Sequence, residues 1–123
     1  MNILINQHSD MPIYEQIKRQ MKQMIIKDEL NEHDKLPSVR TLSKELQIGI
    51  ITVKRAYDDL VKEGLILSIQ GKGYYVSKID KLKIQDSYLE EIKSLMHKIN
   101  ILKKEANIKD TKLKDLWEKE RGK

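Results

Sequence analysis

The chain has 123 residues, enough for one small folded core with an appendage and too few for two substantial domains. Charged residues make up 35% of it and hydrophobic residues 39%, with 24 lysine and arginine side chains against 19 acids and a net charge of +5. The absence of cysteine excludes disulfides and thiolate metal sites, and neither a signal-peptide pattern nor a membrane-length apolar run occurs, so we expect a cytoplasmic protein.

Basic and acidic side chains are unevenly distributed along the chain. Residues 35–78 carry eight lysine or arginine side chains against four acids, whereas residues 1–34 carry four against six. Within the middle segment, residues 46–57 and 64–78 contain no acid. Surface bases are often merely solvated. Two acid-free stretches in a charge-dense chain nevertheless predict one face directed at phosphates.

The first three predicted elements are helices. Asp10 as a polar cap and Pro12 as an early proline open the first, whose apolar side chains recur at helical spacing. Ser38 is the predicted cap of a short second helix within "LPSVRTLSKEL". A "QIG" turn leads to a third helix over about residues 50–63, which ends at Gly64 because glycine favours the position after a helix.

After the third helix the apolar period changes from helical to alternating. The runs "LILSI" and "YYVS" are rich in β-branched and aromatic residues, and "QGKG" between them is a hairpin signature whose glycines supply positive φ. A helix, a helix-turn-helix and a two-stranded hairpin, in that order, make a winged helix. The predicted fold is mostly α with a small β-hairpin: a winged helix-turn-helix in residues 10–79, followed by a short helical dimerisation tail in residues 80–123.

The predicted tail contains no proline, and no glycine before Gly122. Its apolar residues recur at spacings of four, three, four, three and four, which is typical of a helix that packs on another helix. A second short helix is predicted around Trp117. Because so short a helical pair cannot enclose its own core, it must pack on the winged helix or on a second copy of the chain, and we favour a homodimer. The predicted dimer contacts are Tyr88, Leu89, Ile92, Leu95, Met96, Ile99 and Leu102.

The phrases "LPSVRTL", "TVKRAYDDL", "EGLI" and "QGKGYYV" resemble, in identity, spacing and order, the DNA-binding domain of the GntR family of bacterial transcription regulators. The phrase "PIYEQI" matches the helix that precedes them, so the resemblance covers about residues 10–79. The short tail is similar to that of the YtrA-like subfamily, whose second domain is a helical pair used mainly for dimerisation. The resemblance implies a winged helix-turn-helix that binds an operator in double-stranded DNA.

The resemblance also implies particular DNA contacts. Arg40 matches the motif arginine that contacts DNA beside the recognition helix, while Thr52 and Lys54 match polar and basic positions of that helix. The tip of the hairpin reaches the minor groove in the family. Arg55 lies beside Lys54 in an acid-free stretch, which makes it a further candidate. The predicted DNA-binding residues are Ser38, Arg40, Gly49, Ile50, Ile51, Thr52, Lys54, Arg55, Gln70, Gly71 and Lys72.

The turn before the third helix departs from the family pattern, which usually reads Gly-Val-Ser-Arg-Thr-Thr. Gly49 replaces the serine cap, and Ile50 replaces an arginine that commonly reads guanine. We expect general DNA binding to survive both changes, although sequence preference cannot be transferred from the family. Ile50 is expected to pack on a thymine methyl group in the major groove, whereas Ile51 either does the same or tucks beneath its helix.

Together these features predict a sequence-specific DNA-binding transcription regulator, a repressor, that binds a two-fold operator as a homodimer. The rival interpretation is a winged-helix protein-interaction module that does not bind DNA specifically. An enzyme is not expected, because Glu90 and Glu91 diverge around their helix and no Ser/His/Asp set is suggested. No metal, cofactor or membrane partner is predicted, and the sequence does not reveal whether an effector binds.

Overall fold

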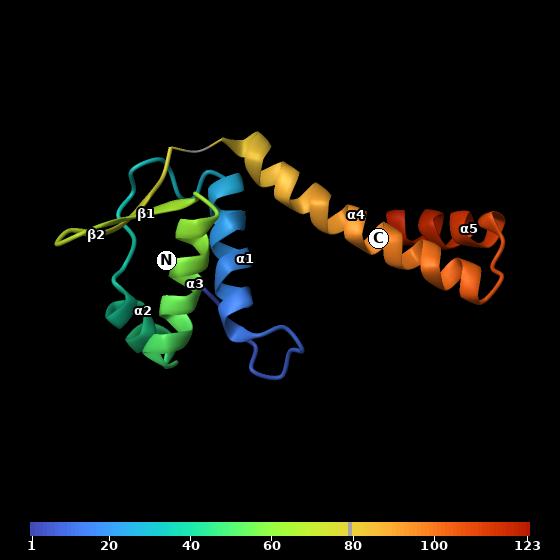
Figure 1. Cartoon of the computed structure of the whole chain (residues 1–123). Coiled ribbons are helices and arrows are strands. Elements are labelled where there is room, and N and C mark those ends of the chain that lie inside the picture. The colour runs from blue at the N-terminus through green and yellow to red at the C-terminus, as the bar shows by residue number, and fades with distance from the viewer. Residues whose placement is uncertain (79) are drawn as a thin grey trace. The chain divides into compact units, whose positions relative to one another are not determined.

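The computed structural model describes residues 1–78 and 80–123. It divides into two compact units, Met1–Lys81 and Leu82–Lys123. The boundary expected at Ile79 falls on a residue outside the described ranges. The elements, shown in Figure 1, are α1 (Ile13–Ile26), α2 (Val39–Leu46), α3 (Ile50–Lys62), β1 (Ile66–Ile69), β2 (Gly73–Val76), α4 (Lys81–Glu105) and α5 (Asp110–Arg121). The order of helices and strands confirms the predicted fold class.

Helix α3 lies at the centre of the first unit, where it packs against α1, α2 and β1 (Figure 1). Its inward stripe is fully buried, as the helical spacing predicts, and consists of Val53, Ala56, Tyr57 and Leu60. The Tyr57 ring meets Tyr74 of β2 edge to face, with centroids 4.7 Å apart, and its hydroxyl donates to the Pro37 carbonyl at 2.7 Å. Burial and the nearby Tyr74 raise the pKa of Tyr57, so the phenol remains a donor. This ring therefore ties α3 to the hairpin and to the segment before α2.

The expected cap of the first helix at Asp10 is wrong. Helix α1 begins after Pro12, which itself occupies the cap position with φ −55° and ψ 148°, and no side chain caps the first turn. Proline has no N–H group and a fixed φ, so it can end the extended segment and start the helix without a preceding polar cap. Gln16 instead donates from its side chain to the Met11 carbonyl at 2.9 Å.

Two glutamines of α1 bind the N-terminal segment through paired hydrogen bonds. Gln20 accepts from the Leu4 N–H at 2.8 Å and donates to the Leu4 carbonyl at 2.7 Å. Gln16 accepts from the Asn6 N–H and donates to the Asn6 carbonyl, both at 2.9 Å. An amide side chain offers one donor and one acceptor face, so each glutamine replaces a strand partner. The arrangement fixes Ile3 in a buried position, and the first compact unit accordingly includes the N-terminal residues.

The predicted hairpin is confirmed. Strands β1 and β2 are antiparallel, with Ile66 opposite Val76 and Ile69 opposite Gly73. The turn between them closes through a hydrogen bond of 2.9 Å from the Lys72 N–H to the Ile69 carbonyl. Gly71 and Gly73 adopt φ of +77° and +107°, values that strain other residues, so glycine is required at the tip.

The segment between α1 and α2 packs beside the hairpin. The His33 N–H donates to the Val76 carbonyl, the Val76 N–H donates to the Asp34 carbonyl, and the Leu36 N–H donates to the Tyr74 carbonyl, each at 2.9 Å. Residues 33–36 thus pair along the outer edge of β2. The hairpin is therefore attached to the helices by backbone bonds on one side and by side-chain packing on the other.

In the second unit, α4 and α5 are joined by a short turn that reverses the chain (Figure 1). Asn107 adopts a left-handed φ of +52°, and the Ile108 N–H donates to the Lys103 carbonyl at 2.9 Å. The Lys103 ammonium lies 2.7 Å from the Asp110 carboxylate at the start of α5. None of the helices in residues 1–78 and 80–123 is both long and apolar enough to span a bilayer.

The apolar stripe of α4 is largely exposed in the single chain. Its members have exposed fractions between 47% and 61%: Leu89, Ile92, Leu95, Met96, Ile99 and Leu102. Tyr88, at the start of the same stripe, is half-buried. Helix α5 has no buried residue, and its Trp117 side chain is 62% exposed. These apolar side chains are thus not buried in a core of the single chain.

Candidate nucleic-acid interface

The helix-turn-helix is fixed by short-range polar contacts. The Ser38 hydroxyl accepts from the Thr41 N–H at 3.1 Å, which confirms it as the cap of α2. Gln47 ends α2 in the left-handed conformation with φ +55°, and the Ser43 hydroxyl donates to the Ile48 carbonyl. Gly49 then precedes α3 without a side chain to cap it, so the first-turn N–H groups of α3 have no side-chain acceptor. This turn sets the direction in which α3 presents its outer face.

The two isoleucines of the opening turn of α3 face outward. Ile50 is 48% exposed and Ile51 is 85% exposed. The alternative that Ile51 tucks beneath its helix is therefore wrong, because the inward positions are already occupied by the buried stripe that starts at Val53. Both side chains are available to a partner, while Thr52 beside them is half-buried.

Ile50 shares a shallow groove with the outer face of α2. The groove is lined by Arg40, Thr41, Ser43, Lys44, Gln47, Ile48 and Ile50. Arg40 is exposed, and within the described part of the chain it forms no ion pair. Its guanidinium is therefore available to an external anion. The structure brings the predicted Arg40 and Ile50 to one surface, with an apolar group next to cationic ones.

Lys54 and Arg55 lie on a second outward groove along α3, together with Ile51. The Lys54 ammonium is 3.1 Å and 3.3 Å from the two carboxylate oxygens of Asp58, one helical turn further on. This hydrogen bond and the charge of Asp58 raise the pKa of Lys54, which keeps the ammonium protonated. Sequence reasoning missed Asp58, although the spacing of four residues on a predicted helix was sufficient to find it.

Arg55 is held by a tyrosine from another helix. Its guanidinium carbon lies 3.7 Å from the centroid of the Tyr14 ring, and its Nη2 donates to the Tyr14 hydroxyl at 3.1 Å. Stacking on an aromatic face leaves the other face and edges of a guanidinium open to a phosphate. Tyr14 of α1 therefore orients a predicted contact residue of α3.

The other acids near α3 are occupied by α1. Lys18 lies 3.4 Å from Asp59, 3.5 Å from Glu63 and 3.4 Å from Glu15. Burial lowers the pKa of Lys18, but the three carboxylates outweigh it and raise the pKa above its usual value. The Lys18 ammonium thus offsets the charges of Asp59 and Glu63, although Asp59 also lines the outward groove that contains Lys54 and Arg55.

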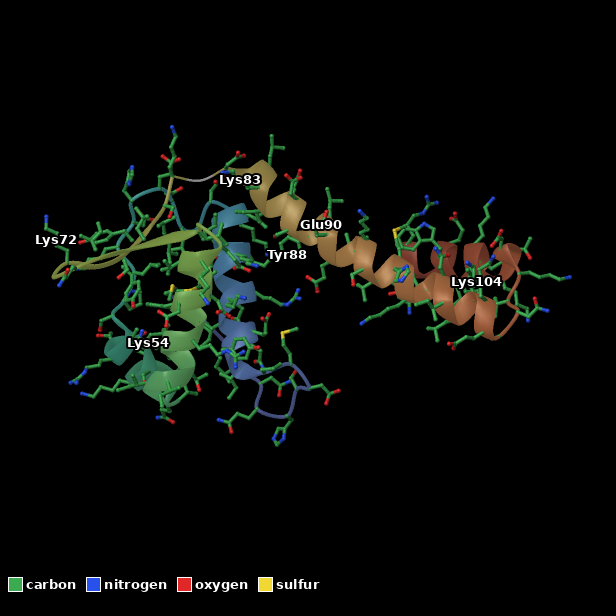
Figure 2. The ribbon with its side chains drawn as sticks, in the orientation of Figure 1. Lys54, Lys72, Lys83, Tyr88, Glu90 and Lys104 are labelled. Atoms are coloured by element: carbon green, nitrogen blue, oxygen red, sulfur yellow. The ribbon has the colours of Figure 1, made fainter. Side chains whose placement is uncertain are left out.

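The hairpin tip supplies the remaining predicted contacts. Gln70, Gly71 and Lys72 are all exposed, and the Tyr75 hydroxyl donates to the Lys72 carbonyl at 3.2 Å. Figure 2 shows Lys72 at the tip and Lys54 on α3. The tip does not line either groove of the helix-turn-helix, so the first unit offers separate helical and hairpin surfaces. In residues 1–78 and 80–123 no three His, Asp or Glu side chains are placed to bind a metal ion.

The model of the family described as "Bacterial regulatory proteins, gntR family" matches residues 13–76, which span the helices and hairpin just described. The chain belongs to the GntR family. The HTH-type transcriptional repressor YtrA of Bacillus subtilis is 36% identical over 118 residues, which cover 96% of this chain and 90% of that protein. The match includes the tail and confirms the resemblance to YtrA. The GntR chain is thus a DNA-binding transcription regulator and not an enzyme.

Two solved structures agree with this assignment. YtrA from Sulfolobus acidocaldarius superposes with a TM-score of 0.62 at 36% identity, over 75% of this chain and 97% of that one. The DNA-binding domain of AraR, in complex with operator ORX1, superposes with a TM-score of 0.56 at 26% identity, over 63% of this chain and 96% of that one. The second of these carries the same fold on operator DNA.

Proposed function

We propose that this GntR-family regulator is a cytoplasmic repressor that binds a two-fold operator as a homodimer, through a DNA-binding domain of residues 10–79 and a dimerisation tail of residues 80–123. Helix α3 enters the major groove, where Ile50 and Ile51 meet base edges. Ser38, Arg40, Gly49, Thr52, Lys54 and Arg55 contact or orient toward phosphates, and Gln70, Gly71 and Lys72 contact the backbone or minor groove. Related proteins that are named repressors support repression rather than activation.

One observation carries the proposal: the opening turns of α3 present apolar and cationic groups outward without a local cap. Ile51 is 85% exposed beside Ile50 at 48%, so the start of α3 offers a small apolar surface to a partner. The major groove offers one apolar feature, the thymine methyl, surrounded by phosphates that attract the neighbouring Arg40 and Arg55. A protein partner without acidic side chains would gain nothing from the charges of Arg40 and Arg55.

The homodimer rests on the tail. The exposed stripe of α4 has the spacing of a helix that packs against helices, and a second copy supplies an equivalent stripe by two-fold symmetry. Two symmetric winged helices then match two half-sites of an operator. The stripe residues from Tyr88 to Leu102 are the proposed interface.

Selection of binding sites from a random duplex pool tests the proposal. We expect enrichment of a two-fold sequence whose half-sites lie about 10 base pairs apart, or a multiple of this, because each α3 needs a major groove on one side of the duplex. Footprinting on the selected duplex should protect both half-sites at the same protein concentration. A pool that stays random after repeated rounds would refute sequence-specific binding, and enrichment of an asymmetric single site would refute the two-fold model.

A further inference from the structure

Helix α3 carries two acids, Asp58 and Asp59, and both line the outward groove that also contains Ile51, Lys54 and Arg55. Asp59 also lies 3.4 Å from Lys18 of α1, whereas Asp58 pairs with Lys54 of the face proposed to meet DNA. Ile51, Lys54 and Asp58 are spaced by three and four residues, so they follow one another along one side of the helix. An acid on such a face opposes binding to a polyanion.

The pairing of Asp58 with Lys54 is poorly explained by helix stability. Both partners are about half exposed, with side-chain exposures of 58% for Lys54 and 49% for Asp58, so solvent screens their attraction. A lysine four residues before an acid is also the order that stabilises helices less than the reverse. The geometry is nonetheless close to both carboxylate oxygens, at 3.1 Å and 3.3 Å.

We propose that Asp58 is a specificity-determining residue, which competes with DNA phosphates for the Lys54 ammonium and so weakens binding to DNA of arbitrary sequence. The proposal rests on the proposed placement of α3 in the major groove. When Lys54 moves to a phosphate, Asp58 loses its partner in a strongly negative field, which opposes binding at every site. The opposition is relieved only where a base offers a donor to the carboxylate, and cytosine N4 is the major-groove donor that acids accept from.

The consequence is a difference between operator and arbitrary DNA. On DNA of arbitrary sequence, Asp58 keeps the Lys54 ammonium away from the phosphates. The affinity for such DNA is therefore lower than the number of basic side chains implies. On the operator a suitably placed cytosine pairs with Asp58, and Lys54 is released without loss. Asp58 therefore increases the ratio of the affinity for the operator to the affinity for arbitrary DNA, which decides whether a regulator finds its site among competing DNA.

The test compares Asp58→Asn with the natural chain, both as full-length protein, on a labelled random-sequence duplex and on the operator obtained by selection. The variant should bind the random duplex several-fold more tightly and the operator with little or no gain, so that their ratio falls. Its salt slope on the random duplex should steepen by about 0.9, the value for one added phosphate contact. Between about 50 and 200 mM salt, the variant should then weaken about 3.5-fold more than the natural chain.

Two further variants make the result decisive. Glu118→Gln removes one negative charge from a surface pair of 2.8 Å with Arg121 in α5 and should leave random-duplex binding unchanged. An equal gain there would overturn the proposal, because net charge alone would explain it. Asp58→Asn combined with Lys54→Ala should lose the gain, and its persistence would overturn competition for Lys54. Circular dichroism melting should show that all variants fold.

Failure of the proposal can be told apart from failure of the interface beneath it. If Lys54→Ala weakens operator binding but Asp58→Asn does not strengthen random-duplex binding, only the role of Asp58 is refuted. If Lys54→Ala changes neither the affinity for the operator nor its salt slope, this face of α3 does not meet phosphates, and the role of Asp58 falls with it. A gain with Asp58→Asn that is equal on operator and random duplexes would refute discrimination.

Discussion

The two compact units of this chain use apolar side chains in opposite ways. In the first unit, the stripe of α3 from Val53 to Leu60 is fully buried against neighbouring elements, and the outer face carries the cations. In the second unit, the stripe of α4 from Leu89 to Leu102 is about half exposed. A buried stripe yields a self-contained fold, whereas an exposed stripe of this length requires a partner surface. The comparison supports the proposal that one unit contacts DNA and the other forms the dimer.

The largest expected effect comes from disrupting the exposed apolar stripe of α4. Ile92→Asp combined with Ile99→Asp places carboxylates in the proposed interface, where they would be buried without partners. We expect monomers by sedimentation equilibrium. Affinity for a duplex with both half-sites should fall by about 10²–10⁴, because one winged helix no longer raises the local concentration of the other. Half-site affinity should remain.

A matched control uses the opposite side of α4. Ser94→Asp combined with His97→Asp introduces the same charge at exposed positions two and five residues beyond Ile92, outside the stripe. This variant should stay dimeric and bind as the natural chain does. If the isoleucine variant also remains dimeric, the stripe does not form the interface.

The next effect distinguishes a core within one chain from a core between chains. Leu60→Ala removes a fully buried side chain from the first unit and should lower the free energy of unfolding by about 2–5 kcal/mol at every protein concentration. Leu95→Ala should be destabilising only where the dimer forms, so its effect should grow with concentration. Urea denaturation followed by circular dichroism over a range of concentrations measures both. A Leu95→Ala effect that is independent of concentration would contradict the comparison.

The parts of the fold that sequence could predict are those set by neighbours in the chain. Helix α3, the Ser38 cap and the glycines of the hairpin tip depend on spacings of a few residues, and the sequence predicts each of them. Asp10 was mistaken for a cap because Pro12 can take that position itself. Local patterns therefore specify the elements but not every boundary.

The contacts that sequence could not predict join distant segments. The bonds of Gln16 and Gln20 to the N-terminal segment, and those of residues 33–36 to β2, cross long stretches of chain and have no local pattern. Asp58 is a different case, because its spacing of four residues from Lys54 on a predicted helix could have revealed the pair. The acid-free stretch ends at Tyr57, yet the helix returns the very next residue to the side of Lys54. A linear run without acids is thus not a surface without acids.

A smaller effect tests the proposed DNA-binding surface of the first unit. Arg40→Ala should weaken binding to all duplexes and reduce the salt slope by about one ion, since the exposed guanidinium is available to a phosphate. Lys112→Ala, which removes the same charge from α5, should leave the slope unchanged. Fluorescence anisotropy across a salt series measures both. Equal slopes for the two variants would mean that net charge, and not the face around α2, governs binding.

The smallest expected effect concerns what the exposed isoleucines read. An aliphatic side chain cannot accept or donate a hydrogen bond, but it can pack on the C5-methyl of thymine, and one such contact contributes about 0.8 kcal/mol, a few-fold in affinity. We expect Ile50 to select thymine at one position in each half-site. Replacing that thymine by deoxyuridine deletes the methyl and keeps the base pair, so affinity should fall for the natural chain and stay level for Ile50→Ala. Ile51→Ala, at 85% exposure against 48% for Ile50, serves as the matched comparison and should still respond to the lost methyl. If only Ile51→Ala abolishes the response, the reader is Ile51, and if no deoxyuridine position distinguishes the proteins, neither isoleucine reads the groove.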